Sequence, residues 1–105
     1  MPSGILGRSN LPASTNTSVY TVPSGKLSVF NVSIANRGSV TAILQLAMSD
    51  SGTPSANDYI EYNSPLIPGG VLERTGLVMD ASKVLVANTS NNDLSIVVFG
   101  YEENA

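Results

Sequence analysis

Two long apolar runs separated by a short polar turn constrain the fold of this chain more than any other feature. The runs are residues 26–36 (KLSVFNVSIAN) and residues 40–48 (VTAILQLAM), and the turn between them is residues 36–39 (NRGS). In the second run apolar residues recur at every other position, which is the period of a β-strand with one face in a core. We therefore expect the two runs to pair antiparallel as a β-hairpin.

Two details of this hairpin can be predicted. Gly38 lies where a type I turn closed by a bulge needs a left-handed residue, so a β-branched residue there should damage the turn. In the first run Leu27 and Val29 lie at odd positions, whereas the apolar residues from Phe30 onward lie at even positions. This change of phase predicts a β-bulge, or a strand that crosses between sheets.

Six further segments have the composition of short strands bounded by Gly, Pro, Asn or Ser. They are residues 18–22, 58–62, 71–74, 77–79, 83–87 and 94–101. With the two apolar runs they predict an all-β fold, an antiparallel, jelly-roll-like β-sandwich of about eight short strands. We expect the sandwich to span residues 18–105. Residues 1–17 show no period and are expected to form either an extended N-terminal arm or a disordered tail.

The last expected strand carries more apolar side chains than one sandwich face can bury. Residues 96–99 (IVVF) are apolar at four consecutive positions, so both faces of the strand are apolar. The strand is therefore expected to be central in its sheet or covered by another subunit. Exposed apolar patches of this kind mark interfaces, and a closed homo-oligomer would cover this one.

The composition excludes several classes of function. The 105 residues include no His and no Cys, which removes the usual general base and the thiolate ligands of metals. Five basic and eight acidic residues give a net charge of −3, without the basic stripe that nucleic-acid binding needs. The chain has no apolar run long enough for a transmembrane helix, and its first residues do not resemble a signal peptide. We therefore expect no nucleic-acid or membrane partner.

The acidic residues do not form a convincing catalytic or metal site. Asp50, Asp58 and Glu61 bracket a long loop, but they lack the spacing of a calcium loop and are expected to form polar turns. A pair for glycoside hydrolysis drawn from Asp58, Glu61 or Glu73 would have no matched acid and base. We expect no catalytic residue, no cofactor and no metal ion.

Aromatic and basic residues offer candidates for binding. The tyrosines are Tyr20, Tyr59, Tyr62 and Tyr101. A sugar-stacking platform is one interpretation of them, although Tyr is also an ordinary sandwich residue with an apolar body and a polar tip. Arg37 and Arg74 are candidates for ion pairs between subunits, where they would set specificity more than stability.

Five short motifs, taken in order, resemble those of a known group of proteins. They are residues 20–26 (YTVPSGK), 35–38 (ANRG), 58–62 (DYIEY), 70–76 (GVLERTG) and 100–103 (GYEE). In this order the chain resembles small virion proteins of tailed bacteriophages, cyanophages among them, of the capsid decoration or cement type. The resemblance implies a β-sandwich on the capsid surface of the virion, forming a homotrimer that binds the major capsid protein without enzymatic activity or a cofactor.

Two functions therefore stay open. The first is a decoration or cement protein that binds and stabilises the head lattice as a homo-oligomer. The second is a tail-fibre or receptor-facing module of the virion that binds glycans. For the first, an extended arm could add a strand to the sheet of a neighbour. The expected interface residues are Ile5, Leu6, Leu11, Arg37, Arg74, Val97 and Phe99.

Overall fold

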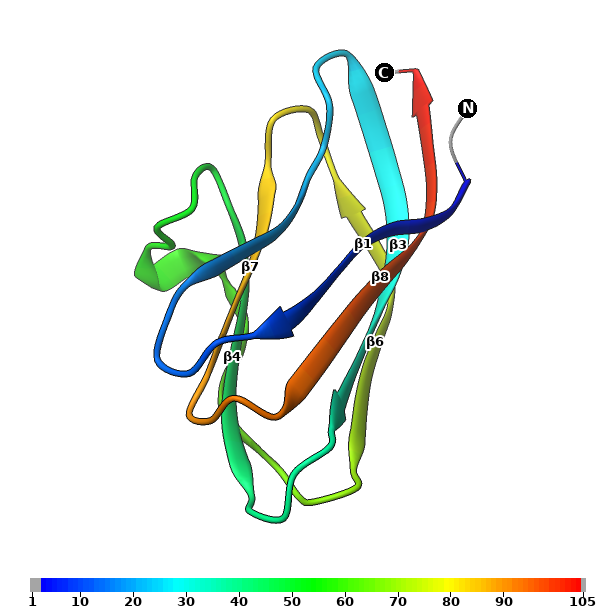
Figure 1. Cartoon of the computed structure of the whole chain (residues 1–105). Coiled ribbons are helices and arrows are strands. Elements are labelled where there is room, and N and C mark those ends of the chain that lie inside the picture. The colour runs from blue at the N-terminus through cyan, green and yellow to red at the C-terminus, as the bar shows by residue number, and fades with distance from the viewer. Residues whose placement is uncertain (1–2, 105) are drawn as a thin grey trace.

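The computed structural model describes residues 3–104 and shows two antiparallel β-sheets of four strands each (Figure 1). The strands are β1 (Ser3–Leu11), β2 (Thr17–Thr21), β3 (Lys26–Asn36), β4 (Ala42–Ser49), β5 (Tyr59–Leu66), β6 (Val71–Met79), β7 (Val84–Thr89) and β8 (Leu94–Asn104). One turn of 3₁₀ helix, η1 (Ala56–Asp58), lies in the loop before β5. Among these residues no helix is long and apolar enough to cross a membrane.

The strand order is that of a jelly roll. Sheet A has the order β1-β8-β3-β6, and sheet B has the order β2-β7-β4-β5. The pairs β1–β8, β2–β7, β3–β6 and β4–β5 are those of one long antiparallel hairpin. This hairpin is rolled up so that β3 also pairs with β8, and β4 with β7. The expected all-β, jelly-roll-like sandwich is therefore confirmed.

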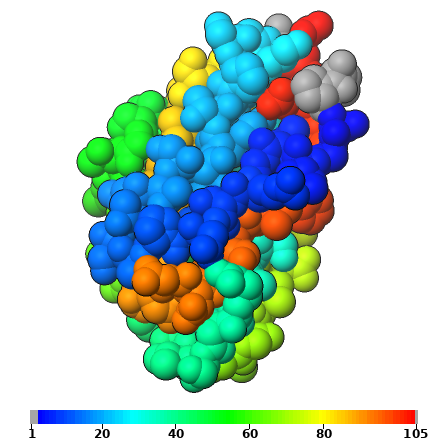
Figure 2. All heavy atoms as spheres, viewed as in Figure 1, coloured from blue at the N-terminus to red at the C-terminus, as the bar shows by residue number. Residues whose placement is uncertain are grey.

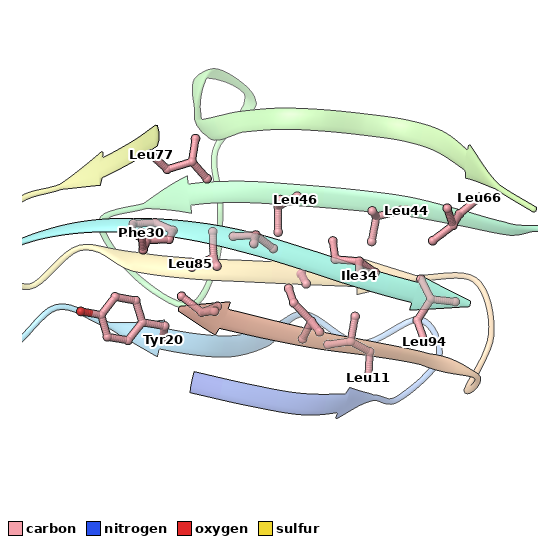
Figure 3. Packing of buried hydrophobic residues seen from close by; sticks show 14 of the residues in the cluster. Leu11, Tyr20, Phe30, Ile34, Leu44, Leu46, Leu66, Leu77, Leu85 and Leu94 are labelled. Carbon is pink, nitrogen blue, oxygen red and sulfur yellow. The ribbon is translucent and has the colours of Figure 1, made fainter. Parts of the chain in front are cut away.

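The core lies between the two sheets and follows the period of two along each strand. In β3 every even-numbered residue from Ser28 to Asn36 is buried, and in β8 Leu94, Ile96 and Val98 point the same way. Side chains from both sheets interdigitate in this layer (Figure 3). Burying each large aliphatic side chain contributes roughly 1.5–3 kcal/mol, so this layer is the main source of stability.

The expected hairpin between the two apolar runs is wrong. β3 lies in sheet A between β8 and β6, whereas β4 lies in sheet B between β7 and β5, so residues 37–41 cross from one sheet to the other. Both runs bury one face in the same core, and a period of two cannot tell a neighbour in the sheet from a strand across the core. Gly38 is not left-handed; it lies against Asp93, whose Cβ would be 2.8 Å from an added Cβ.

The expected phase change in β3 is also wrong. Ser28 is buried, so it continues the inward series that Phe30 begins, and the strand alternates without interruption. The bulge lies at this level but in β6, where Thr75 and Gly76 form the extra length opposite Asn31. The two expected segments 71–74 and 77–79 are therefore one strand.

The N-terminal segment is part of the sandwich rather than a separate arm. β1 is an edge strand of sheet A and pairs with β8 along its length, and Leu11 is only 1% exposed. The expected boundary between residues 17 and 18 therefore does not separate an arm from the sandwich. A register shift between Ile5 and Gly7 breaks the alternation of β1, which is why the sequence shows no period there. Residues 1 and 2 of the expected arm lie outside the described residues.

Candidate interaction surfaces

Asp58 and Glu61, the two acidic residues near the long loop that are best placed for chemistry, have structural roles. The backbone N–H of Ser55 donates to Asp58 Oδ2 over 2.8 Å, which lowers the pKa of that carboxyl and closes the turn of η1. Glu61 accepts a hydrogen bond of 2.6 Å from the Ser64 hydroxyl and one of 2.5 Å from Arg74. These bonds, that of Ser64 first, hold the pKa of Glu61 below its usual range.

The Arg74–Glu61 ion pair joins the two sheets at one side of the sandwich. Arg74 comes from the edge strand β6 of sheet A, and it also donates to the backbone oxygen of Ile60 over 2.9 Å in β5 of sheet B. Arg74 was expected to pair with another subunit, but its acidic partner is on the same chain. Between residues 3 and 104 no cluster of three or more potential metal-ligating side chains is found.

Sequence reasoning missed a buried polar cluster near the C-terminal end of β8. The Tyr20 hydroxyl donates to Glu102 Oε2 over 2.5 Å and lies 2.9 Å from Ser28 Oγ. All three side chains are buried. Burial and the neighbouring Glu102 raise the pKa of Tyr20 to about 12. The expected strand 94–101 stops one residue before Glu102, although Glu102 lies four residues beyond buried Val98 and so keeps the inward parity of the strand.

The remaining tyrosines lie on two different surfaces. Tyr101 is exposed on the outer side of sheet A. Tyr59 and Tyr62 lie on β5 with their ring centroids 4.9 Å apart and their planes at 74°. With Pro54 and Ala56 they line an open hollow of about 580 Å³, and Tyr62 is 61% exposed. We name this surface the Tyr59–Tyr62 hollow. Among the described residues, Tyr59 and Tyr62 are the one pair of tyrosines close enough to form the sugar-stacking platform that the sequence allows.

The outward side of sheet A, which we name the sheet A face, is ordered in four rows. The strand registers give the rows as Ser3, Tyr101, Val29 and Val78; Ile5, Phe99 and Asn31; Arg8, Val97, Ser33 and Glu73; Asn10, Ser95, Ala35 and Val71. The first two rows are mainly apolar, and Ile5, Val78 and Tyr101 in them are exposed. The only charged side chains in the four rows are Arg8 and Glu73, at opposite edges of the sheet.

A second apolar surface lies at one end of the sandwich, where two loops meet. These are residues 37–41 and 67–70, which lie side by side at the lower end of Figures 1 and 2, and we name them the tip. Val40 is 65% exposed and Ile67 is 64% exposed. Asn36 holds the loops together because its Nδ2 donates to the backbone oxygens of Val40 (2.9 Å) and Leu66 (3.0 Å).

The expected interface residues divide between these places. Ile5, Val97 and Phe99 come together on the sheet A face, where Ile5 and Phe99 are register partners and Val97 lies in the next row. Leu6 packs against the core and Leu11 is buried, so neither is free to anchor an arm.

Arg74 lies on the edge strand β6 and pairs with Glu61, whereas Arg37 reaches the fourth row of the sheet A face. Arg37 is exposed at the tip, and its guanidinium donates to Asn10 Oδ1 of the same chain.

The central position of β8 accounts for its apolar character only in part. Its inward residues are in the core, while Val97 and Phe99 remain half-buried on the sheet A face.

No protein-family model matches this chain, and no curated protein matches it.

Proposed function

We propose that this protein is a structural protein of a virion, a decoration or cement protein that binds the head lattice of a tailed bacteriophage as a homo-oligomer. One observation carries the proposal. Six of the eight exposed large apolar side chains among the described residues lie on two adjoining surfaces of one small domain, the sheet A face and the tip. A cement protein needs two such surfaces, one to join its own copies and one to hold the lattice.

The properties of these surfaces suit binding by shape. Charged residues make up 12% of the chain, about half of the roughly 25% in an average domain. Little of the binding energy would then be Coulombic, so salt would weaken it only slightly. Many weak contacts of this kind strengthen one another when the copies are arranged on a symmetric lattice.

We assign the lattice contact to the tip, which would bind the major capsid protein. Val40 and Ile67 project from loops that Asn36 already fixes, so little conformational entropy is lost on binding. Arg37 begins the first of these loops and is exposed, and its guanidinium donates to Asn10 Oδ1.

A role without catalysis agrees with the positions of the polar groups. Glu61 is held by Arg74 and Ser64, and Glu102 is held by Tyr20 inside the sandwich. Asp58 closes a turn. Each of these groups has a structural partner, and such partners oppose the freedom that acid–base catalysis requires.

The proposal is tested by adding purified protein to phage heads that lack it and measuring occupancy. A variant with Val40→Asp and Ile67→Asp should lose most of its occupancy, because it puts two charges into the apolar contact. Tyr62→Asp is the matched control, since Tyr62 is similarly exposed but lies on β5, away from the tip. Equal occupancy of the tip variant and the control would refute the lattice contact.

A second candidate function is a glycan-binding module of the virion, and the Tyr59–Tyr62 hollow favours it. Exposed tyrosines beside an open hollow can stack on the apolar face of a sugar while their hydroxyls bond to it. Saturation-transfer NMR with a panel of bacterial surface glycans should then show contacts that Tyr62→Ala abolishes. A wild-type protein that binds none of them would remove this candidate.

A further inference from the structure

We propose that two copies of this chain associate through their sheet A faces, related by a two-fold axis that runs parallel to the strands between β8 and β3. The inference rests on the proposed function in taking the sheet A face as the surface that joins copies, and it adds the orientation and the register. The observations that carry it are the distributions of charge and of side-chain size over the face.

The charges occupy opposite ends of one row. Arg8 on β1 and Glu73 on β6 are separated by three strand spacings, roughly 14 Å, so they cannot pair within one chain. Neither takes part in any ion pair found among residues 3–104. A two-fold axis that lies between the two packed faces, parallel to the strands, keeps each row opposite the same row of the other copy. Within that row it places the β1 edge of one copy opposite the β6 edge of the other. Arg8 of one copy then faces Glu73 of the other, and the contact occurs twice.

The side chains also differ in size between the two halves of the face. The half formed by β1 and β8 carries Ile5, Phe99 and Tyr101, whereas the half formed by β3 and β6 carries smaller groups in the same rows. The proposed axis places Tyr101 opposite Val29, Phe99 opposite Asn31, and Ile5 opposite the Gly76 bulge. Large groups therefore meet small ones, as close packing between two sheets requires.

Other arrangements lack this match. A two-fold axis perpendicular to the strands would set β8 against β8, so that Phe99 and Val97 crowd each other and Arg8 faces Ile5. The resemblance implies a trimer, and one form of it is a three-fold ring that joins the β1 edge of one copy to the β6 edge of the next. That ring would pair Arg8 with Glu73 but leave the apolar rows uncovered.

The size of the face sets the strength of the contact. Four strands and the six-residue interval between the outer rows give a face of about 20 Å by 20 Å. Two copies would bury on the order of 1,000 Å² in total, at the low end for specific interfaces. We therefore expect a dissociation constant in the micromolar range, with dimers dominant where the protein is concentrated.

Sedimentation equilibrium over a concentration series tests the inference. The wild-type chain should shift from monomer to dimer, and Arg8→Glu and Glu73→Arg should each weaken the dimer about tenfold, because each places two like-charge pairs at the rim. Combining the two substitutions should restore the wild-type constant. Ile43→Asp on the outer side of sheet B is the control for an added charge. A monomer throughout the range, a trimer, or a double variant weaker than both single ones would overturn it.

Crosslinking tests the face-to-face geometry without relying on affinity. The chain has no cysteine, so Val97→Cys and Ser33→Cys each introduce a unique thiol in the two central strands. A short bifunctional thiol reagent should link the two variants when they are mixed, more efficiently than it links either variant alone. Absence of that preference would contradict the proposed axis. Because these measurements use no capsid, their failure would leave the tip variants as an independent test of lattice binding.

Discussion

Asn36 is the residue whose replacement tests most sharply how the tip is held. Its side chain is 2% exposed and makes three hydrogen bonds to the backbone. Nδ2 donates to the carbonyl oxygens of Val40 and Leu66, and Oδ1 accepts from the N–H of Gly38 over 2.9 Å. One amide therefore joins the end of β3 to both loops of the tip.

The cost of Asn36→Ala follows from these bonds. Each contributes about 0.5–1.5 kcal/mol net, and a buried backbone group left without a partner costs more. Water can reach some of the freed loop groups, so we expect the free energy of unfolding to fall by about 2–4 kcal/mol. For a domain of this size the melting temperature should fall by roughly 10–20 °C.

Asn36→Asp is the informative comparison because it keeps the shape and the acceptor. The carboxylate would still accept from Gly38, but it would face the carbonyl oxygens of Val40 and Leu66 without a proton to donate. Its pKa should rise, so this variant should gain stability relative to the wild type as the pH falls through that pKa.

Urea unfolding measures the loss, and amide hydrogen exchange locates it. In Asn36→Ala the amides of Gly38 and Gly69 should exchange faster, while those of the β3–β8 ladder should keep their order of protection. Occupancy on phage heads should fall together with the order of the tip. A stability within 0.5 kcal/mol of the wild type would refute the conclusion that this side chain holds the tip.

Three further predictions follow from the polar groups and from β1. Tyr20→Phe should cost about 1.5–3 kcal/mol by removing the hydrogen bond to Glu102. Since the Tyr20 pKa is raised from 10.0 to about 12, the wild type should lose about 2–3 kcal/mol between those pH values in a pH-resolved melt, and Tyr20→Phe should lack this loss. Folding lowers the pKa of Glu61 from its ordinary value of 4.5, so ionised Glu61 stabilises the fold above pH 4.5. This stabilisation is lost as the pH falls through the lowered pKa. In an acid titration, Glu61→Gln should therefore lose less stability than the wild type. Deleting residues 1–11 should unfold or strongly destabilise the protein by circular dichroism, because it removes Leu11 from the core and an edge strand from sheet A; a fully stable truncation would contradict this.

The period of two in the sequence predicted which way many side chains point. Ala42, Leu44 and Leu46 were expected on the core face of their strand, and all three are buried, whereas Val40 of the same series lies before the strand and is exposed. The same period could not choose the partner strand, because a residue facing the core has the same environment whether its neighbour lies beside it or across the layer. In a jelly roll these choices depend on pairings between distant strands, such as β1 with β8, and no local pattern encodes them.

The sequence predicted some residues of the candidate surfaces and missed others, as it did for the fold. The sequence indicated that Val97 and Phe99 exceed what one core face needs, and Ile5 joins them through the register of β1 with β8. It could not show that Leu11 turns inward, because the register shift after Ile5 hides the parity of the strand. Asn36 was read as part of a polar turn, and its buried amide becomes visible only when the loop after β5 folds beside it.

A cryo-electron microscopy map of the virion tests the central claim most directly. We predict density for this sandwich at repeated points of the head lattice, with the tips against the major capsid protein and the sheet A faces of two copies packed on each other. Copies confined to the tail, or sheet A faces lying directly on the capsid, would contradict that claim.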